Sequence, residues 1–188
     1  KVMYASKKGI DFIICDHHRP GAKIPKAKAV LDTKQEDCEY PFKELCGCGV
    51  GFKLIQALAS KKGETIEDLV LYLDLVVTAI GADIVPIVGE NRTLAYHGLK
   101  VINKNPRPGF EAILKQVKKE KLTITDVVFI IAPRINAAGR ILHGKHAVEV
   151  LVEKDKSKAM TYASKINEHN SARKNLDKSI TEEALKLV

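Results

Sequence analysis

The amino-acid sequence predicts an α/β protein, in which part of a parallel-sheet domain is followed by a mostly helical connector. Two short apolar runs, residues 11–15 and 27–32, are typical of strands buried on both faces. Beyond them, apolar residues recur at spacings of three and four, which indicates helices. The chain has 188 residues and is 45% hydrophobic, so it can bury a sizeable core. We expect the sheet-bearing part to span residues 1–105 and the helical connector to span residues 106–188.

The first helices can be placed around these strands. Residues 1–8 are expected to end a helix at Gly9, before the first strand. A helix is predicted over residues 42–60, where glycines interrupt the apolar pattern. Glycine costs about 1 kcal/mol in a helix interior, so we expect close packing against a neighbour there. Thr65 is expected to begin the next helix, which continues through a run that is apolar nearly all round and therefore buried.

The remainder of the chain is mostly helical in pattern. Helices are predicted over residues 91–104 and 109–120, with the turn "NPRPG" between them. Residues 125–132 fit a strand and a helix equally well. From residue 145 onward the pattern is helical with one interruption, and residues 157–188 form one long amphipathic helix.

Composition favours an intracellular protein with an anionic partner. The sequence contains 31 Lys and Arg against 23 Asp and Glu, a formal net charge of +8. This charge suits nucleic acid, although a lysine-rich proteome would also produce it. The sequence contains no apolar stretch of about 18 residues and no signal-peptide pattern, so we expect a cytoplasmic protein without membrane contact.

The four cysteines fit reduced thiols better than a disulfide framework. Cys46 and Cys48 could suggest zinc, with Cys38 upstream. Their spacing is not that of a zinc knuckle, however, and Cys48 falls on the apolar stripe of the predicted helix. We therefore interpret these cysteines as buried thiols.

The stretch "FIICDHHRPG" places Asp16, His17 and His18 directly after a predicted buried strand. Ligands gather beyond the carboxyl ends of parallel strands, and a carboxylate with imidazoles can bind Mn²⁺, Mg²⁺ or Zn²⁺. A solvated polar loop is the alternative. Adjacent side chains on an extended chain point to opposite sides, so we expect only one of the two histidines to ligate a given ion.

Asp83 lies inside the apolar stretch "AIGADIVPI". Burial of an unpaired carboxylate costs several kcal/mol, so this side chain should have a metal ion or a histidine as its partner. A solvent-facing position at a helix end is the alternative, because Pro86 limits the helix. Asp74, earlier in the same segment, is a second candidate.

The stretch "APRINAAGR" places Arg134, Asn136 and Arg140 around small residues. Arginine makes bidentate contacts with phosphate, and small residues allow a backbone to approach closely. The stretch therefore predicts a phosphate-binding segment, or else a tight helix junction with exposed arginines.

Taken together, these segments resemble the DHH phosphoesterase superfamily, and within it the branch of single-stranded-DNA exonucleases. The similarity lies in "FIICDHHRPG", "CEYPFKELCGCGVGFKL", "YLDLVVTAIGADIVPIVGENRTLAYHGLKVIN" and "IIAPRINAAGRI", in this order, over nearly the whole chain. The first is shared by the superfamily, whereas the others are typical of the exonuclease branch.

The resemblance implies a 5′–3′ exonuclease that degrades single-stranded DNA in repair and recombination, with two Mn²⁺ or Mg²⁺ ions that activate water. It implies that His17 and Asp83 are metal ligands and that Asp16 supports the metal site. It also implies that His18 contacts the scissile phosphate, and that Arg134, Asn136 and Arg140 lie along the DNA path.

Parts of the family pattern are missing. The 188 residues include neither the Asp-x-Asp motif and second aspartate of the family nor its glycine-rich C-terminal lobe. We therefore expect a fragment that binds metal weakly and has little activity alone. Apolar surface exposed on such a fragment would allow it to form a homodimer.

Two other functions remain open. The first is a phosphodiesterase of the same family that acts on short oligonucleotides or cyclic dinucleotides. The second is a non-catalytic nucleic-acid-binding module, which would bind DNA without metal and with steep salt dependence.

Overall fold

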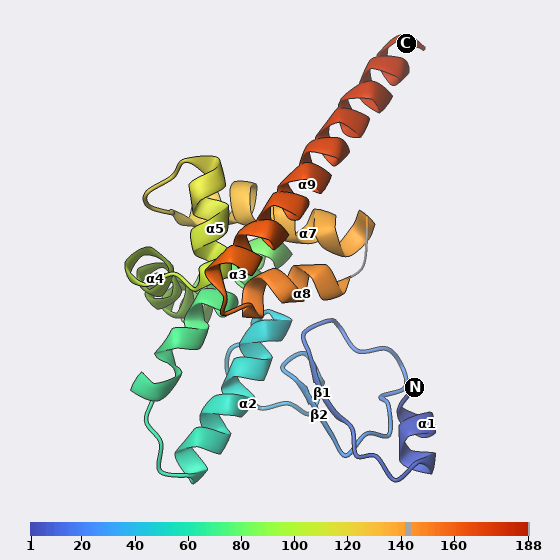
Figure 1. The fold of residues 1–188 in the computed structure, drawn as a ribbon. Helices are drawn as coiled ribbons and strands as arrows, with labels where there is room; N and C mark the ends of the chain where they lie inside the picture. The colour runs from blue at the N-terminus through green and yellow to red at the C-terminus, as the bar shows by residue number, and fades with distance from the viewer. Residues whose placement is uncertain (142–143, 188) are drawn as a thin grey trace. The chain divides into compact units, whose positions relative to one another are not determined.

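The computed structural model describes residues 1–141 and 144–187, with the side chains of residues 138–143 outside the description. It divides into two compact units, Lys1–Gly98 and Leu99–Val188, which are described separately below (Figure 1). The first contains the described strands and the second is helical. The predicted fold class, a partial parallel sheet followed by a mostly helical segment, is confirmed.

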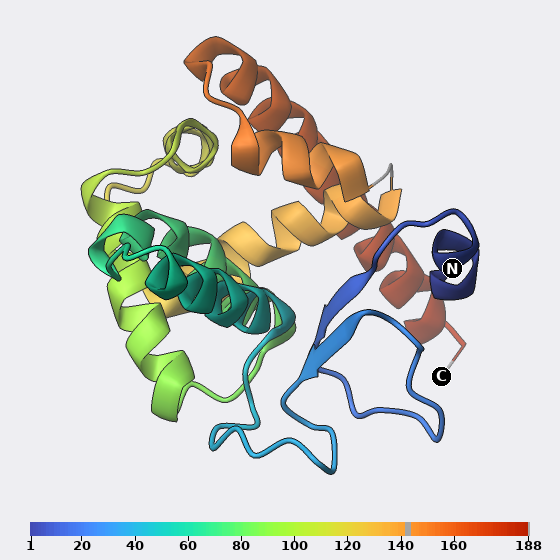
Figure 2. The ribbon, with the colours of Figure 1, turned by 90° about the horizontal axis from the view of Figure 1, so that it is seen from below.

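The first unit begins with helix α1 (Val2–Lys7), followed by strands β1 (Ile13–Asp16) and β2 (Ala29–Asp32). The strands pair in parallel, in a register that aligns the two aspartates at their carboxyl ends. They run side by side in both views (Figures 1 and 2). Polar side chains that follow β1 and β2 therefore emerge at the same edge of this sheet.

Helix α2 (Gly47–Lys61) begins later than the predicted start at residue 42. Cys46 caps it, because its Sγ accepts a hydrogen bond from the Gly49 N–H at 3.3 Å. This cap fixes the helix start and leaves the preceding segment non-helical. Of the glycines expected to pack closely, Gly47 lies against His17, whereas a Cβ at Gly51 would meet open space.

The next predicted helix is divided into two parts. A 3₁₀ helix, η1 (Glu67–Tyr72), is followed by α3 (Leu73–Asp83). The Asp68 carboxylate accepts hydrogen bonds from both the N–H and the hydroxyl of Thr65, as the capping pattern predicts. The expected burial of the apolar run is confirmed within α3. The buried side chains of this unit include Leu45, Phe52, Leu73, Val76, Val77 and Ile80.

Helix α4 (Gly89–Lys104) continues the chain to the second unit. That unit contains α5 (Pro108–Val117), α6 (Ile124–Asp126), the π-helical turn η2 (Val127–Ile131), α7 (Ala132–Ile141), α8 (Gly144–Val152) and α9 (Lys156–Leu185). The ambiguous residues 125–132 are therefore helical. Thr123 and Asp126 form a capping box that starts this helical run.

The long helix predicted near the C-terminus is confirmed as α9, which Asp155 caps through its side chain. Its expected amphipathic character is not confirmed over the whole helix, because its buried residues, Ala159, Ala163, Ile166 and Asn170, all lie in the first half. Its first half packs against α5, α7 and α8, whereas its second half extends beyond them (Figure 1). The buried core of the unit includes Ile102, Phe110, Ile113, Leu122, Ile131, Val150 and Ile166. Among the described residues, no helix combines the length and apolar character needed to cross a membrane.

Candidate functional site

A tight polar turn follows the carboxyl end of β1. The Asp16 Oδ1 atom accepts hydrogen bonds from the N–H groups of His17 at 2.7 Å and His18 at 3.2 Å. The same oxygen lies 2.7 Å from His18 Nδ1. The His18 ring, assisted by the two N–H groups, lowers the pKa of the Asp16 carboxyl below its ordinary value. Asp16 is therefore an anion that holds the turn together.

This turn corrects one expectation from the sequence. His17 and His18 do not point to opposite sides, because the chain leaves the extended conformation at the end of β1. Their ring centroids lie 4.4 Å apart and the rings are tilted by 52°. The two imidazoles are neighbours on one surface, so both can face a common ligand.

The structure brings His17 and Asp83 together, although they are far apart in the sequence. The His17 Nε2 atom lies 3.5 Å from Asp83 Oδ2. The His17 side chain is 17% exposed and that of Asp83 is 41% exposed. Asp83 is the last residue of α3, and Ile84 follows with a left-handed φ of 53°. The helix end therefore presents the carboxylate to the turn after β1.

The spacing of these two atoms is that of an ion pair, and it also matches the spacing of two ligands on one divalent cation. A separation of 3.5 Å is at the outer limit of a hydrogen bond. Two ligands held about 2.1 Å from one ion lie about 3 to 3.5 Å apart, for angles between octahedral and tetrahedral. Carboxylate oxygen suits Mg²⁺ and Mn²⁺, whereas imidazole nitrogen suits transition metals such as Zn²⁺ and Fe²⁺. His17 and Asp83 are only two ligands. Among the described residues, no group of three or more His, Cys, Asp or Glu side chains is placed to hold a metal ion.

Gly47 forms the wall behind the His17 ring. A Cβ atom at this position would lie 3.3 Å from His17 Cδ2, which is closer than side-chain atoms ordinarily pack. The first residue of α2 therefore needs to be small for the ring to occupy its present position. Close packing at these glycines was predicted from the sequence, but the contact of Gly47 with His17 was not.

Two other aspartates near these elements are buried. Asp74, the second candidate from the sequence, is 1% exposed within α3, and its carboxylate accepts the Leu75 N–H at 2.7 Å. Asp32 is 6% exposed at the end of β2, opposite Asp16 in the strand register, and accepts the Lys34 N–H. The sequence analysis did not single out Asp32. Its position at the end of a strand was the available signal.

The predicted phosphate-binding residues lie in α7, in the second unit. Arg134 is half-buried, and burial lowers the pKa of its guanidinium. Its Nε donates to Asn167 Oδ1 at 3.1 Å, and its Nη1 donates to the Ile130 carbonyl at 2.8 Å. Asn136 is exposed. The side chain of Arg140 lies outside the described part of the structure. Arg134 thus has a structural role within the helical unit, whatever else it contacts.

The cysteines match the buried-thiol interpretation only in part. Cys46 is fully buried, and burial raises the pKa of its thiol, so it is a neutral helix cap. Cys15 and Cys38 are half-buried, and Cys48 is exposed. The prediction of a buried Cys48 is wrong, because the face of α2 that is buried carries Gly49, Val50, Phe52 and Ala59 instead.

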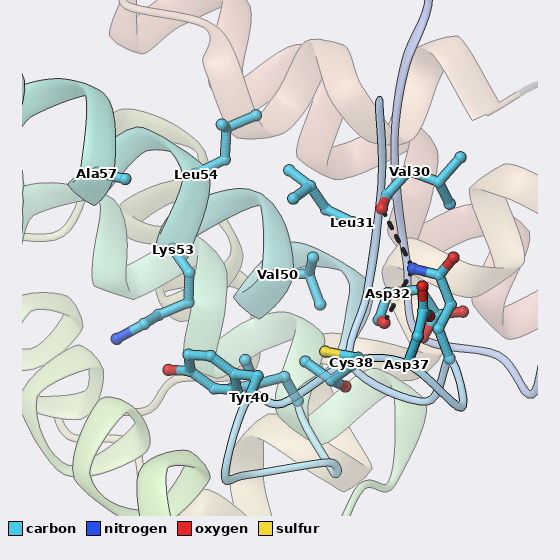
Figure 3. Close-up of a pocket in the computed structure, with 13 residues that line it drawn as sticks. Val30, Leu31, Asp32, Asp37, Cys38, Tyr40, Val50, Lys53, Leu54 and Ala57 are labelled. Carbon is cyan, nitrogen blue, oxygen red and sulfur yellow. Dashed lines mark hydrogen bonds between the residues drawn. The ribbon is translucent and has the colours of Figure 1, made fainter. Parts of the chain in front are cut away.

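A cavity of about 430 Å³ lies between β2, α2 and the segment that connects them. Val50 and Leu54 of α2 lie across it from Leu31 of β2 (Figure 3). Polar groups at one end contact one another: the Tyr40 hydroxyl donates to Glu90 Oε2 at 2.6 Å, and Lys53 lies 2.9 Å from Glu90 Oε1. The cavity is mainly apolar, and we assign no reaction to it.

Comparison with known proteins connects this geometry to a family. Residues 1–80 match the N-terminal domain of the DHH family. The chain is 38% identical over 186 residues to the single-stranded-DNA-specific exonuclease RecJ of Bacillus subtilis, covering 98% of this chain and 23% of that protein. It is 34% identical to RecJ of Escherichia coli, covering 99% of this chain and 34% of that protein.

Solved structures show the same fold. A crystal structure of exonuclease RecJ bound to manganese matches with a TM-score of 0.86 and 29% identity, over 98% of this chain and 46% of that one. RecJ from Thermus thermophilus in complex with Mn²⁺ matches with a TM-score of 0.84 and 28% identity, over 96% of this chain and 27% of that one. The chain spans about a quarter to a third of the length of the curated relatives. Residues 1–80 are therefore similar to the N-terminal domain of the DHH family, within a chain that is similar to RecJ along nearly its whole length.

Proposed function

We propose that this chain carries part of the catalytic site of a metal-dependent phosphodiesterase that degrades single-stranded DNA from a 5′ end. The observation that supports it most directly is the approach of His17 Nε2 to Asp83 Oδ2 at 3.5 Å. The similarity to RecJ proteins, with solved structures that contain Mn²⁺ or Mg²⁺, supports the same conclusion. The net charge of +8 suits a polyanionic substrate.

Each residue of the first unit has a separate role in this proposal. His17 and Asp83 hold a divalent ion, which when bound lowers the pKa of a coordinated water and neutralises charge on the phosphate. Asp16 fixes the turn through its hydrogen bonds to the His17 and His18 backbone. The His18 ring, which is 78% exposed beside the His17 ring, is accessible to a phosphate oxygen.

The second unit supplies the proposed DNA path. Asn136 is exposed on α7 and can hydrogen-bond to a DNA backbone. Arg134 donates through its Nε to Asn167 and through its Nη1 to the Ile130 carbonyl, and we assign its second terminal nitrogen to a DNA phosphate. Arg140, on the same helix, belongs to the proposal on the strength of the sequence resemblance alone. We place this activity in DNA repair and recombination, in the cytoplasm.

The activity is proposed for the longer protein that these relatives represent. Because the chain covers 23% and 34% of the first two relatives, we propose that further metal ligands come from sequence outside it. The 188-residue chain alone should then bind Mn²⁺ weakly and degrade DNA little. Its exposed apolar side chains near the N-terminus, Met3, Tyr4 and Ile13, suit a homodimer. Analytical ultracentrifugation would test that association.

The test of function uses the complete gene product that carries this sequence. We expect Mn²⁺-dependent release of nucleotides from the 5′ end of single-stranded DNA, and little action on dinucleotides. His17→Ala and Asp83→Asn should each reduce this rate by at least about 100-fold, since even outer-shell changes at metal sites cost 10- to 100-fold. Full activity in both variants would contradict the proposal. Tight, metal-independent DNA binding without degradation would favour a non-catalytic module instead.

A further inference from the structure

Asn91, in the first turns of α4, connects two segments beside the His17 and Asp83 pair. Its side chain is fully buried. Its Nδ2 donates to the Glu44 carbonyl at 2.6 Å and to the Pro86 carbonyl at 3.0 Å. Both donors of one amide are thus used on backbone groups from different parts of the chain. A side chain with this pattern fixes the separation of the two segments.

The two bonded segments lead directly to the site. Glu44 lies three residues before Gly47, which forms the wall behind the His17 ring. Pro86 lies three residues after Asp83, beyond the left-handed residue Ile84. Neither Glu44 nor Pro86 belongs to a regular helix or strand. The amide of Asn91 therefore links the segment that positions the imidazole to the segment that follows the carboxylate.

The chemistry of the amide explains why an asparagine occupies this position. Its Oδ1 atom is buried and has no hydrogen-bond partner among the described residues, which is costly. The position is therefore used for its two donors. An aspartate of the same shape would place a carboxylate oxygen against two carbonyl oxygens, which repel it. An apolar side chain would leave both carbonyls without the hydrogen bonds that the amide donates.

We propose that Asn91 is a positioning residue, whose amide sets the spacing of His17 and Asp83 that the divalent ion requires. This inference rests on the proposed function for the role of the ion. The spacing itself is a property of the metal-free protein. Asn91 touches neither the ion nor the substrate and acts through the segments of Glu44 and Pro86.

Asn91→Leu tests the proposal because it keeps the size of the side chain and removes both donors. Ala95→Gly is the matched control, since Ala95 is 3% exposed on the same helix and glycine weakens a helix without touching either segment. Asn91→Ser, a smaller change, serves if the leucine variant does not fold. Mn²⁺ affinity of the complete gene product is measured by electron paramagnetic resonance, beside the melting temperature of each variant.

We expect Asn91→Leu to weaken Mn²⁺ binding by about 10- to 100-fold, in the range of outer-shell changes. Ala95→Gly should change it by less than about 2-fold at a comparable loss of melting temperature. Equal effects of the two variants on Mn²⁺ affinity would overturn the proposal, because Asn91 would then contribute only to general stability.

A metal-free measurement separates this inference from the proposed function. The ring ¹⁵N signals of His17 in the 188-residue chain should shift in Asn91→Leu in the direction seen in Asp83→Asn, and stay unchanged in Ala95→Gly. If His17→Ala leaves Mn²⁺ affinity intact, the proposed function fails, and these ring signals alone decide the role of Asn91. Unchanged His17 signals in Asn91→Leu would then refute it.

Discussion

The turn after β1 and the contact between α7 and α9 each bring together polar side chains that are distant in the sequence. The two regions use these side chains in different ways. His17 and Asp83 approach only to 3.5 Å, at the limit of a direct hydrogen bond. Arg134, in contrast, donates to Asn167 at 3.1 Å and to Ile130 at 2.8 Å. The first arrangement leaves two potential ligand atoms at a spacing that one divalent ion could bridge, whereas the second uses its polar groups to hold helices together. Similar polar residues can therefore mark a site or a scaffold, and geometry distinguishes the two.

The largest effect is expected at Gly109, in the helical unit. A Cβ atom there would lie 1.8 Å from the Val150 carbonyl oxygen, so α5 or α8 would have to move. Overpacking usually costs about 1 to 3 kcal/mol, and this backbone clash should lower the free energy of unfolding by more. Urea denaturation of Gly109→Ala measures it. A variant as stable as the wild type would show that the α5–α8 contact does not hold the unit together.

A smaller loss is expected for Arg134→Ala. The substitution removes two hydrogen bonds from a charged donor that is only half-buried. Because water replaces part of what is lost, we expect a total of about 1.5 to 3 kcal/mol. A double-mutant cycle with Asn167→Ala should recover a coupling energy between the two side chains. Asn136→Ala, on the same helix but exposed, is the control and should leave stability unchanged. If the stability losses of Arg134→Ala and Asn167→Ala are simply additive, the two side chains do not stabilise each other. The contrast between this structural contact and the His17–Asp83 site would then be lost.

These two regions also show which features could be predicted from the sequence. The apolar run and the triplet after it predicted a strand with Asp16, His17 and His18 at its end, because strand periodicity is local. The partner expected for Asp83 was argued from burial, and that premise is wrong: the carboxylate is 41% exposed at the end of α3, where His17 nevertheless lies beside it. The 3.5 Å approach, the shared surface of the two rings and the Asn91 amide depend on tertiary packing, which no local pattern encodes.

In the helical unit, the main helix was predictable, whereas the role of a key side chain was not. Its long helix was predictable because residues 157–188 contain neither glycine nor proline to end it. The role of Arg134 was not, because a guanidinium in a run of small residues predicts a phosphate contact and a helix junction equally. In the first unit, by contrast, the start of α2 was missed because its cap is a cysteine, a residue that preferred capping patterns do not include.

Gly47→Ala sharpens the comparison by disturbing only the site. The added methyl would sit 3.3 Å from His17 Cδ2 and push the ring by a few tenths of an ångström, without removing a hydrogen bond. Since alanine is the better helix former, the melting temperature should not fall. We expect Mn²⁺ affinity of the complete gene product to weaken by about 10-fold. Unchanged affinity would mean that the position of the His17 ring is not critical.

The smallest effect concerns acid stability of the helical unit. Lys119, with the capping bonds of Thr123, lowers the pKa of the Asp126 carboxyl to about 2. The ordinary pKa is about 3.9, so its stabilisation is present above pH about 4 and is lost as the pH falls toward 2. Asp126→Asn should unfold at lower urea at neutral pH, and its stability should depend less on pH between 4 and 2. Parallel pH profiles for the two proteins would contradict this assignment.

Paramagnetic broadening tests most directly whether His17 and Asp83 together hold a divalent cation. Trace Mn²⁺ is titrated into the ¹⁵N-labelled 188-residue chain while the ring signals of its six histidines are followed. We predict that the His17 ring broadens at the lowest Mn²⁺ concentration, with His18 next, and that Asp83→Asn removes this preference. Equal broadening of His17 in wild type and Asp83→Asn, or earlier broadening of a histidine elsewhere, would contradict the account.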